Sequence, residues 1–349
     1  MFETKPYGEK LRKGLNDFYQ EFPGAEIIFL SESGSLLHGT ANKESDVDIK
    51  GVFIPSYTDL MLKKKTTFRY TTGDKRFSND SEDFDLDLYD IRDFFDNLGK
   101  NDITAVDLFF SLFSKEAVLY KTEKSEFIKT IKAELLTKRS KSFLGFALKQ
   151  VTVYTKKAER LEELRKLKSF FEKYEFGTNL EMRNALEYFF KEQNYKFLKK
   201  VVFQKKGKEE VFFEILGRRF SQSLKPARFY KELVRIEREF GDRVLDAAKN
   251  NNLSLKAVAH AFRAVLELLE YYNTGSIKFP LSTEIKNKVI EIKEVKEDKD
   301  LDSLLEELDK LLEKVYAVEE KSELPVYQNK VLIKKRLIEI IRMENVRYV

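Results

Sequence analysis

The sequence has no cysteine and only two histidines, His38 and His260, in 349 residues. The absence of cysteine excludes disulfides, cysteine-based zinc sites and cysteine nucleophiles. Two histidines nearly exclude a multi-histidine metal site, so a hard ion held by oxygen, such as Mg²⁺ or Mn²⁺, is favoured. Metal ligands are therefore expected among the aspartates and glutamates.

Long apolar runs are also missing. No stretch approaches the roughly 18 apolar residues that predict a membrane span, and the N-terminus Met-Phe-Glu-Thr-Lys-Pro lacks the apolar region of a signal peptide. The formal net charge of +5 is too slight for a fully basic coat that binds nucleic acid. We expect a cytoplasmic protein with no membrane partner.

The most informative segment is residues 34–54, GSLLHGTANKESDVDIKGVFI. Gly34-Ser35 follows an apolar run and suits a turn that cradles phosphate. Asp46 and Asp48 are spaced as i and i+2, so on a strand both carboxylates point the same way and can reach metal ions that align phosphoryl oxygens. A lone Asp-x-Asp is most often a turn or an exposed edge. Its coincidence with Gly-Ser and with the apolar run Val52–Ile54 favours an enzyme that moves a nucleotide.

A third carboxylate is expected from Asp83–Leu88, which alternates strictly between acidic and apolar residues. Such alternation predicts a strand whose aspartates share one face. Asp85 is the first choice as third metal ligand and Asp87 is the alternative. Lys50 continues the alternation of the Asp-x-Asp strand, so it should share the carboxylate face and either neutralise the carboxylates or meet a phosphate.

The pattern of apolar residues predicts an α/β (α+β) domain with a mixed sheet over residues 1–120. Helices are expected near 5–21, 89–98 and 103–112, and strands near 26–31, 47–54, 66–72 and 83–88. Residues 121–349 are expected to form a mostly helical domain with a β-hairpin inserted near 197–216. A chain of this length can build two domains with well-formed cores.

A second constellation lies on one predicted helix. Lys256, His260, Arg263 and Glu267 are spaced by four, three and four residues, so they form one stripe among small apolar residues. A half-buried polar stripe of this kind suits the binding of a base or a phosphate. The alternative is a surface stripe of i,i+4 pairs with a histidine satisfied in the core.

These features resemble the DNA polymerase beta-like nucleotidyltransferase superfamily, whose signature is Gly-Ser, a spacer and Asp-x-Asp. More narrowly, the chain is similar to the YcgL-type branch of predicted nucleotidyltransferases. The positions that match the core of this branch are Gly34, Ser35, His38, Gly39, Thr40, Ser45, Asp46, Asp48, Ile49, Lys50, Gly51 and Val52. The likeness extends to Tyr89–Phe95, to the Lys256–Arg263 helix and to Thr274–Pro280. Asp102, however, stands where the branch has proline, and Asp107 stands at its acidic position.

The resemblance implies a polymerase beta-like fold and roles for some of the matching residues. Asp46 and Asp48 would bind metal, and Asp85 would complete the site and help to activate the attacking hydroxyl. The resemblance also implies that Gly34 and Ser35 contact the triphosphate. Independently of it, we expect the His260 helix to face the active-site cleft, so the residues expected to face the bound nucleotide are Gly34, Ser35, Lys50, Lys256, His260 and Arg263.

The expected activity is metal-dependent transfer of a nucleoside monophosphate from an NTP to a hydroxyl acceptor, with release of pyrophosphate. An RNA 3′ end is the first choice of acceptor, as in RNA repair or tRNA-directed addition. A protein or a small molecule is the second choice. From another class, the alternative is an inactive nucleotide- or RNA-binding module, although the intact Gly-Ser and Asp-x-Asp argue against lost activity.

Overall fold

The computed structural model describes residues 5–43, 45–62, 67–72, 83–139, 141–173, 177–192, 195–205, 208–240, 255–294 and 299–343. The chain divides into two compact units. The first joins Met1–Leu148 with Ala259–Val349, and the second is Lys149–Val258. This border differs from the one expected at residue 120, because C-terminal helices such as α15 (Lys330–Arg342) pack with α4 (Ile91–Gly99) of the N-terminal part.

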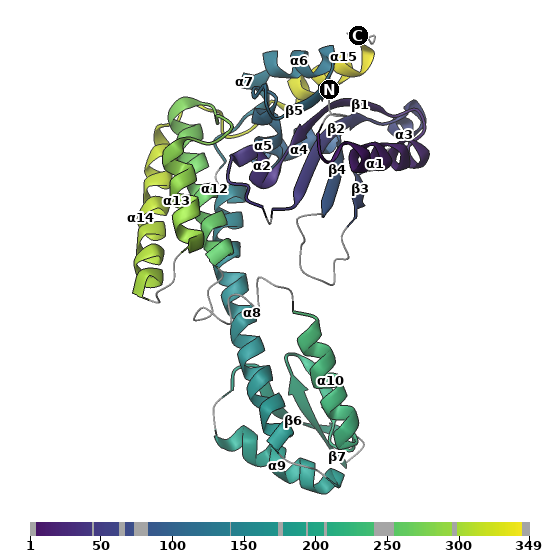
Figure 1. The fold of residues 1–349 in the computed structure, drawn as a ribbon, viewed down its shortest axis with the longest axis vertical. Helices are drawn as coiled ribbons and strands as arrows, with labels where there is room; N and C mark the ends of the chain where they lie inside the picture. Colours follow the sequence, from purple (N-terminus) through teal and green to yellow (C-terminus); the bar gives the residue numbers. More distant parts are fainter. Residues whose placement is uncertain are drawn as a thin grey trace. The chain divides into compact units, whose positions relative to one another are not determined.

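A five-stranded mixed sheet forms the centre of the first unit (Figure 1). Its strands lie in the order β3 (Thr67–Thr71), β4 (Phe84–Asp90), β2 (Val47–Ile54), β1 (Glu26–Glu32) and β5 (Val118–Lys121). β2 and β4 are parallel, and the other neighbouring strands are antiparallel. The alternating patterns of β2 and β4 therefore run side by side, with their polar residues on the same face.

Helix α1 (Gly8–Glu21) covers the apolar face of this sheet. Phe18 of α1 is fully buried and contacts Phe53 of β2 and Phe68 of β3, with ring centroids 5.0 and 5.4 Å apart. Leu86 and Leu88 of β4 belong to the same core. Because successive strand residues point to opposite faces, the polar residues between these apolar ones face away from α1.

The opposite face is covered in part by α4 and by α5 (Ile103–Ser111). Phe94 of α4 packs against Phe29 of β1, with ring centroids 6.0 Å apart. Both helices begin at an aspartate cap, Asp90 for α4 and Asp102 for α5, whose side chains accept backbone N–H groups of the first turn. The polar residues of β2 and β4 lie on this same face, where Asp48, Lys50 and Asp85 are half-buried and Asp87 is buried.

Shorter and C-terminal helices complete the first unit. They are α2 (Gly34–His38), α3 (Tyr57–Met61), α6 (Glu123–Thr130), α7 (Lys132–Leu135), α12 (Leu255–Thr274, in this unit from Ala259), α13 (Thr283–Glu294), α14 (Lys299–Lys321) and α15. The buried Tyr271 of α12 donates its hydroxyl to the carbonyl oxygen of Thr137 at 2.9 Å. An ion pair between Lys288 and Glu307 joins α13 to α14, which lie side by side (Figure 1). No helix in the described ranges is long and apolar enough to cross a membrane.

The second unit has a core of its own. It contains most of α8 (Lys141–Lys173), α9 (Asn179–Glu192), α10 (Pro226–Arg238) and an antiparallel sheet of β6 (Leu198–Lys205), β7 (Lys208–Ile215) and β8 (Arg218–Ser221). Phe213 of β7 and Phe229 of α10 are fully buried in this core. The hairpin expected near 197–216 is thus extended by a third strand, whose four residues are too few to show a pattern.

The expected fold class is confirmed: a mixed α/β domain precedes a mostly helical region with a small inserted sheet. Three local details differ. β4 continues to Asp90 instead of ending at Leu88, because Asp90 caps α4 and the helix starts only at Ile91. The Gly-Ser turn opens into the five-residue helix α2, and the short edge strand β5 has no counterpart among the expected strands.

Candidate active site

The Gly-Ser segment lies against the start of β2. The backbone N–H of Ser33 donates to the carbonyl oxygen of Asp48 at 2.8 Å, and α2 begins at the next residue. Gly34 has a φ of +56°, and a Cβ at this position would collide with Oδ2 of Asp48. Glycine is therefore required for the chain to turn this close to the carboxylate. The Oγ atom of Ser35 is buried, and no residue in the described ranges bonds to it.

Asp48 and Asp85 are neighbours across the parallel strands. The register of β2 and β4 pairs these two residues directly, so their side chains share the face opposite α1. Asp46 lies two residues before Asp48, just ahead of the first residue of β2. Burial raises the pKa of Asp48 to about 6, and the carboxylates of Asp46 and Asp85 add to this effect against the opposing charge of Lys50. Negative charge is thus crowded at this point of the sheet.

Asp87, the alternative third carboxylate, is held by two cations. Lys50 Nζ lies 3.0 Å from its Oδ2, and Arg69 Nε lies 2.7 Å from its Oδ1. Burial disfavours the charge of Lys50, but Tyr89, Asp87 and Asp48 outweigh this and raise the pKa of Lys50 above its usual value. Asp85 has no ion pair within the described ranges. Of the two, Asp85 is the one whose oxygens are free to bind something else.

The donor set of Asp46, Asp48 and Asp85 fits a hard divalent ion. Carboxylate oxygens are the ligands that Mg²⁺ and Mn²⁺ prefer, and a cation relieves the repulsion between crowded carboxylates. Their oxygens do not form a closed cluster, because the group of described residues whose ligand atoms all lie within 4.8 Å of one another is His38, Asp107 and Glu267. Mutual repulsion of like charges favours the open arrangement.

The cluster of His38, Asp107 and Glu267 already contains a cation, the guanidinium of Arg263. Nη1 of the buried Arg263 lies 2.8 Å from Nε2 of His38, 3.1 Å from Oδ2 of Asp107 and 2.9 Å from both carboxylate oxygens of Glu267. The guanidinium occupies the place that a metal would need, so we assign this cluster to internal charge pairing. We call these four residues the α2 anchor, because they tie α2 to α5 and α12.

The anchor holds His38 as a neutral ring. Burial and the charge of Arg263 lower the pKa of His38 to about 4, although Asp107 opposes them. A neutral imidazole can accept the Arg263 hydrogen bond at Nε2 only if its proton sits on Nδ1. The pKa of Glu267 moves the other way, because burial raises it above the usual range.

The two motifs that are far apart in sequence meet at α2. Phe279 lies against the His38 ring with centroids 5.7 Å apart, and the N–H of Leu281 donates to the carbonyl oxygen of His38 at 3.3 Å. A Cβ on Gly39 would come within 2.9 Å of Pro280. The Thr274–Pro280 segment and the Arg263 helix therefore both support the helix that begins with Gly34-Ser35.

The residues of the predicted stripe have different surroundings. Arg263 is buried and bonded within the anchor, so it supports α2; its predicted nucleotide contact stays a prediction. Lys256 is exposed and belongs to the second unit, and His260 is half-buried in the first. Nucleotide contacts of these two residues stay predictions. The part played by Asp107 was missed, although one carboxylate in the otherwise apolar run Val106–Phe110 signals a buried partner.

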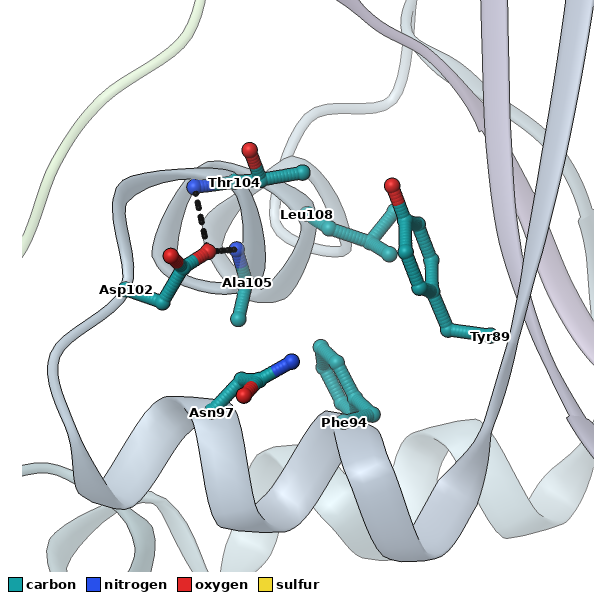
Figure 2. Close-up of a pocket in the computed structure, with 7 residues that line it drawn as sticks. All are labelled: Tyr89, Phe94, Asn97, Asp102, Thr104, Ala105 and Leu108. Atoms are coloured by element: carbon teal, nitrogen blue, oxygen red, sulfur yellow. Dashed lines mark hydrogen bonds between the residues drawn. The ribbon is translucent and has the colours of Figure 1, made fainter. Parts of the chain in front are cut away.

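A pocket of about 120 Å³ opens on the carboxylate face of the sheet, beyond Asp87. Its lining residues come from β4, α4 and α5: Tyr89, Phe94, Asn97, Asp102, Thr104, Ala105 and Leu108. Figure 2 shows Phe94 and Asn97 opposite the first turn of α5, with the Tyr89 ring beside them. Oδ1 of Asp102 accepts the N–H groups of Thr104 and Ala105 at 3.1 and 3.2 Å.

Comparison with known proteins agrees with this geometry. Residues 8–176 match the family described as RlaP, RNA repair pathway DNA polymerase beta family. The chain is 27% identical over 270 residues to an uncharacterized 38.9 kDa protein in the nrdC-mobD intergenic region of Enterobacteria phage T4. This alignment covers 73% of the chain and 80% of the phage protein. No solved structure matches the chain.

The matched residues include the entire five-stranded sheet, the Gly-Ser segment and the three aspartates. The narrower resemblance to the YcgL-type branch stays a prediction. The match and the mixed sheet agree on the broader superfamily. Residues 8–176 therefore carry a polymerase beta-like nucleotidyltransferase domain.

Proposed function

We propose that the protein transfers a nucleoside monophosphate from an NTP to the 3′ hydroxyl of an RNA. The hydroxyl oxygen bonds to the α-phosphorus, the bond between this phosphorus and the bridging oxygen to the β-phosphate breaks, and pyrophosphate leaves. The hydroxyl proton passes to a carboxylate or to water. The observation that carries the proposal is the direct pairing of Asp48 with Asp85 on one sheet face, beside the turn at Gly34.

In this proposal Asp46, Asp48 and Asp85 hold divalent cations of the Mg²⁺ type. When bound, such ions neutralise the charge of the phosphates and align the reacting oxygens. Asp85 also positions the attacking hydroxyl, because it lies on the neighbouring strand and no ion pair in the described ranges holds it. Gly34 and Ser35 receive the β- and γ-phosphates with backbone N–H groups and the Ser35 hydroxyl.

Lys50 supports this face through Asp87. It neutralises part of the carboxylate charge and is fixed by its 3.0 Å contact with Asp87 Oδ2. The α2 anchor fixes His38 at the end of α2, and thereby holds the Gly34-Ser35 turn at the start of this helix. The chain's own residues thus bind and orient both reactants before any bond changes.

RNA is the proposed acceptor because the matching family is described as an RNA repair pathway family. The test uses NTP labelled at the α-phosphate, Mg²⁺ or Mn²⁺, and one RNA oligonucleotide prepared with either a 3′ hydroxyl or a 3′ phosphate. Label is expected on the 3′-hydroxyl RNA alone. Equal labelling of both RNAs, or label on the protein or a small molecule instead, would contradict the RNA 3′ end as acceptor.

A further inference from the structure

The pocket between β4, α4 and α5 has the size and lining of a site for one small ring system. Its volume of about 120 Å³ is close to the roughly 150 Å³ of a cavity that binds one benzene ring. Tyr89, Asn97, Asp102 and Thr104 are only partly buried, so the pocket reaches the surface. The pocket can therefore admit a ligand group from outside.

The lining chemistry suits a planar, uncharged heterocycle. The rings of Phe94 and Tyr89 and the side chains of Ala105 and Leu108 supply apolar walls. The Tyr89 hydroxyl, the Asn97 amide and the Thr104 hydroxyl are the uncharged hydrogen-bonding groups of the lining, and the Asn97 amide oxygen accepts from Lys100 Nζ at 3.4 Å. Hydrogen-bonding groups of this kind read the polar edge of a base, and aromatic rings stack on its face.

The same lining disfavours a phosphate. None of the seven residues is a lysine or an arginine, and Asp102 carries a negative charge. A ligand in this pocket must therefore keep its phosphates elsewhere. The donor nucleotide meets this condition, because its phosphates are proposed to lie at Gly34-Ser35 and the aspartates.

Strand β4 connects the pocket to the carboxylates. Tyr89 lies four residues after Asp85 on the same face, about 13 Å along the strand. Between them lies Asp87, the partner of Lys50. Lys50, Asp87 and Asp102 all influence the Tyr89 hydroxyl, whose pKa is raised chiefly by burial. Tyr89 thus stands between the charged face and the pocket.

We propose that this pocket receives the base of the donor NTP and sets the base preference of the enzyme. Phe94 and Tyr89 would pack against the ring, and Asn97 and Thr104 would bond to its edge. The inference rests on the proposed function for the placement of the phosphates. Its test measures binding without catalysis, so that it stays valid if no transfer is found.

The first experiment measures binding of adenosine, guanosine, cytidine and uridine to the full chain without metal, by saturation-transfer NMR with titration. One nucleoside is expected to bind at least tenfold more tightly than the others. Asn97→Ala should weaken that binding at least tenfold, and Ala105→Leu, which fills the pocket, should abolish it. Asp96→Ala is the matched control, because Asp96 is an exposed neighbour on α4 and should bind as the wild type does.

The second experiment separates the donor from the acceptor by competition in Asp48→Asn, which cannot turn over in the proposed mechanism. The NTP with the preferred base should displace the bound nucleoside, and a 3′-hydroxyl RNA oligonucleotide should not. The inference is overturned if no nucleoside binds, if Asn97→Ala and Ala105→Leu bind as the wild type does, or if RNA displaces the nucleoside and NTP does not. Absence of transfer by the wild type, with its nucleoside binding intact, would count against the proposed function alone.

Discussion

Asp85 and Asp87 share a strand face, but they differ in what surrounds them. Asp87 accepts from Lys50 and Arg69 on its two oxygens, whereas Asp85 is paired in register with Asp48. A carboxylate already bound by two cations is a poor metal ligand, because a metal would have to displace them. Partner cations thus distinguish residues that spacing alone makes equivalent.

The first prediction compares Asp85→Asn with Asp87→Asn. Asp85→Asn is expected to lower kcat by on the order of 100-fold or more, with little change in unfolding free energy. Asp87→Asn should leave more activity but cost about 1–3 kcal/mol of stability, because Lys50 loses a partner in a partly buried setting. Transfer kinetics and urea unfolding measure the two effects. The reverse order of activities would make Asp87 the third ligand.

The second prediction concerns His38 and acid. Its pKa is lowered to about 4 by burial and Arg263, whereas an unfolded histidine titrates near 6.5. Between these values the unfolded chain binds a proton that the folded chain does not, so stability is lost as pH falls from about 6.5 to about 4. The loss due to His38 is up to about 3 kcal/mol.

The measurement is urea unfolding of the wild type and of His38→Gln at pH 7 and pH 4.5. The stability difference between them should shrink or reverse at the lower pH, since glutamine does not titrate. A difference that is the same at both pH values would show that His38 is not held neutral in the fold.

At the scale of elements, the short helix α2 is held in place by a buried cluster of charged side chains, the α2 anchor. A five-residue helix is too short to be stable alone, and α2 takes its position from Ser33 bonded to β2, from the anchor, and from Phe279 against His38. The turn at Gly34-Ser35, which we propose binds phosphate, therefore depends on α12, more than 200 residues away in sequence.

The third prediction tests the anchor with Arg263→Met. This change leaves Asp107 and Glu267 buried without their cation, which should cost about 3–5 kcal/mol. Lys256→Met lies on the same helix but is exposed, so it should change stability by less than about 0.5 kcal/mol. Adding Glu267→Gln to Arg263→Met should recover part of the loss. Equal stability of Arg263→Met and Lys256→Met in urea unfolding would rule out the anchor.

The elements were largely predictable from sequence, but the anchor was not. Strict alternation in β2 and β4 predicts both strands and the shared face of their aspartates, because period two is a local property. The spacing of Glu267 and Arg263 predicts that they share one helix stripe, yet their partners His38 and Asp107 come from two other helices. The apolar run around Asp107 signals a buried partner but does not identify it, so the burial of Arg263 and its supporting position appear only in three dimensions.

At the scale of the whole molecule, the proposed transfer chemistry is confined to the first compact unit. Gly34, Ser35, the three aspartates, the α2 anchor and the base pocket all belong to it. The domain border predicted at residue 120 places Asp107 and Arg263 in different domains. In the structure, Arg263 donates a hydrogen bond to Asp107 within the first unit. The second unit has a separate core around Phe213 and Phe229.

The most direct test of the central claim is transfer of label from two forms of one NTP to a 3′-hydroxyl RNA, with the wild type and Asp48→Asn side by side. With the wild type and Mg²⁺, label from the α-phosphate should appear in the RNA and label from the γ-phosphate in pyrophosphate. Asp48→Asn, matched to the wild type in thermal stability, should give neither labelled RNA nor labelled pyrophosphate. Wild-type transfer by Asp48→Asn, or γ-label on the RNA, would contradict the proposed nucleotidyl transfer at these aspartates.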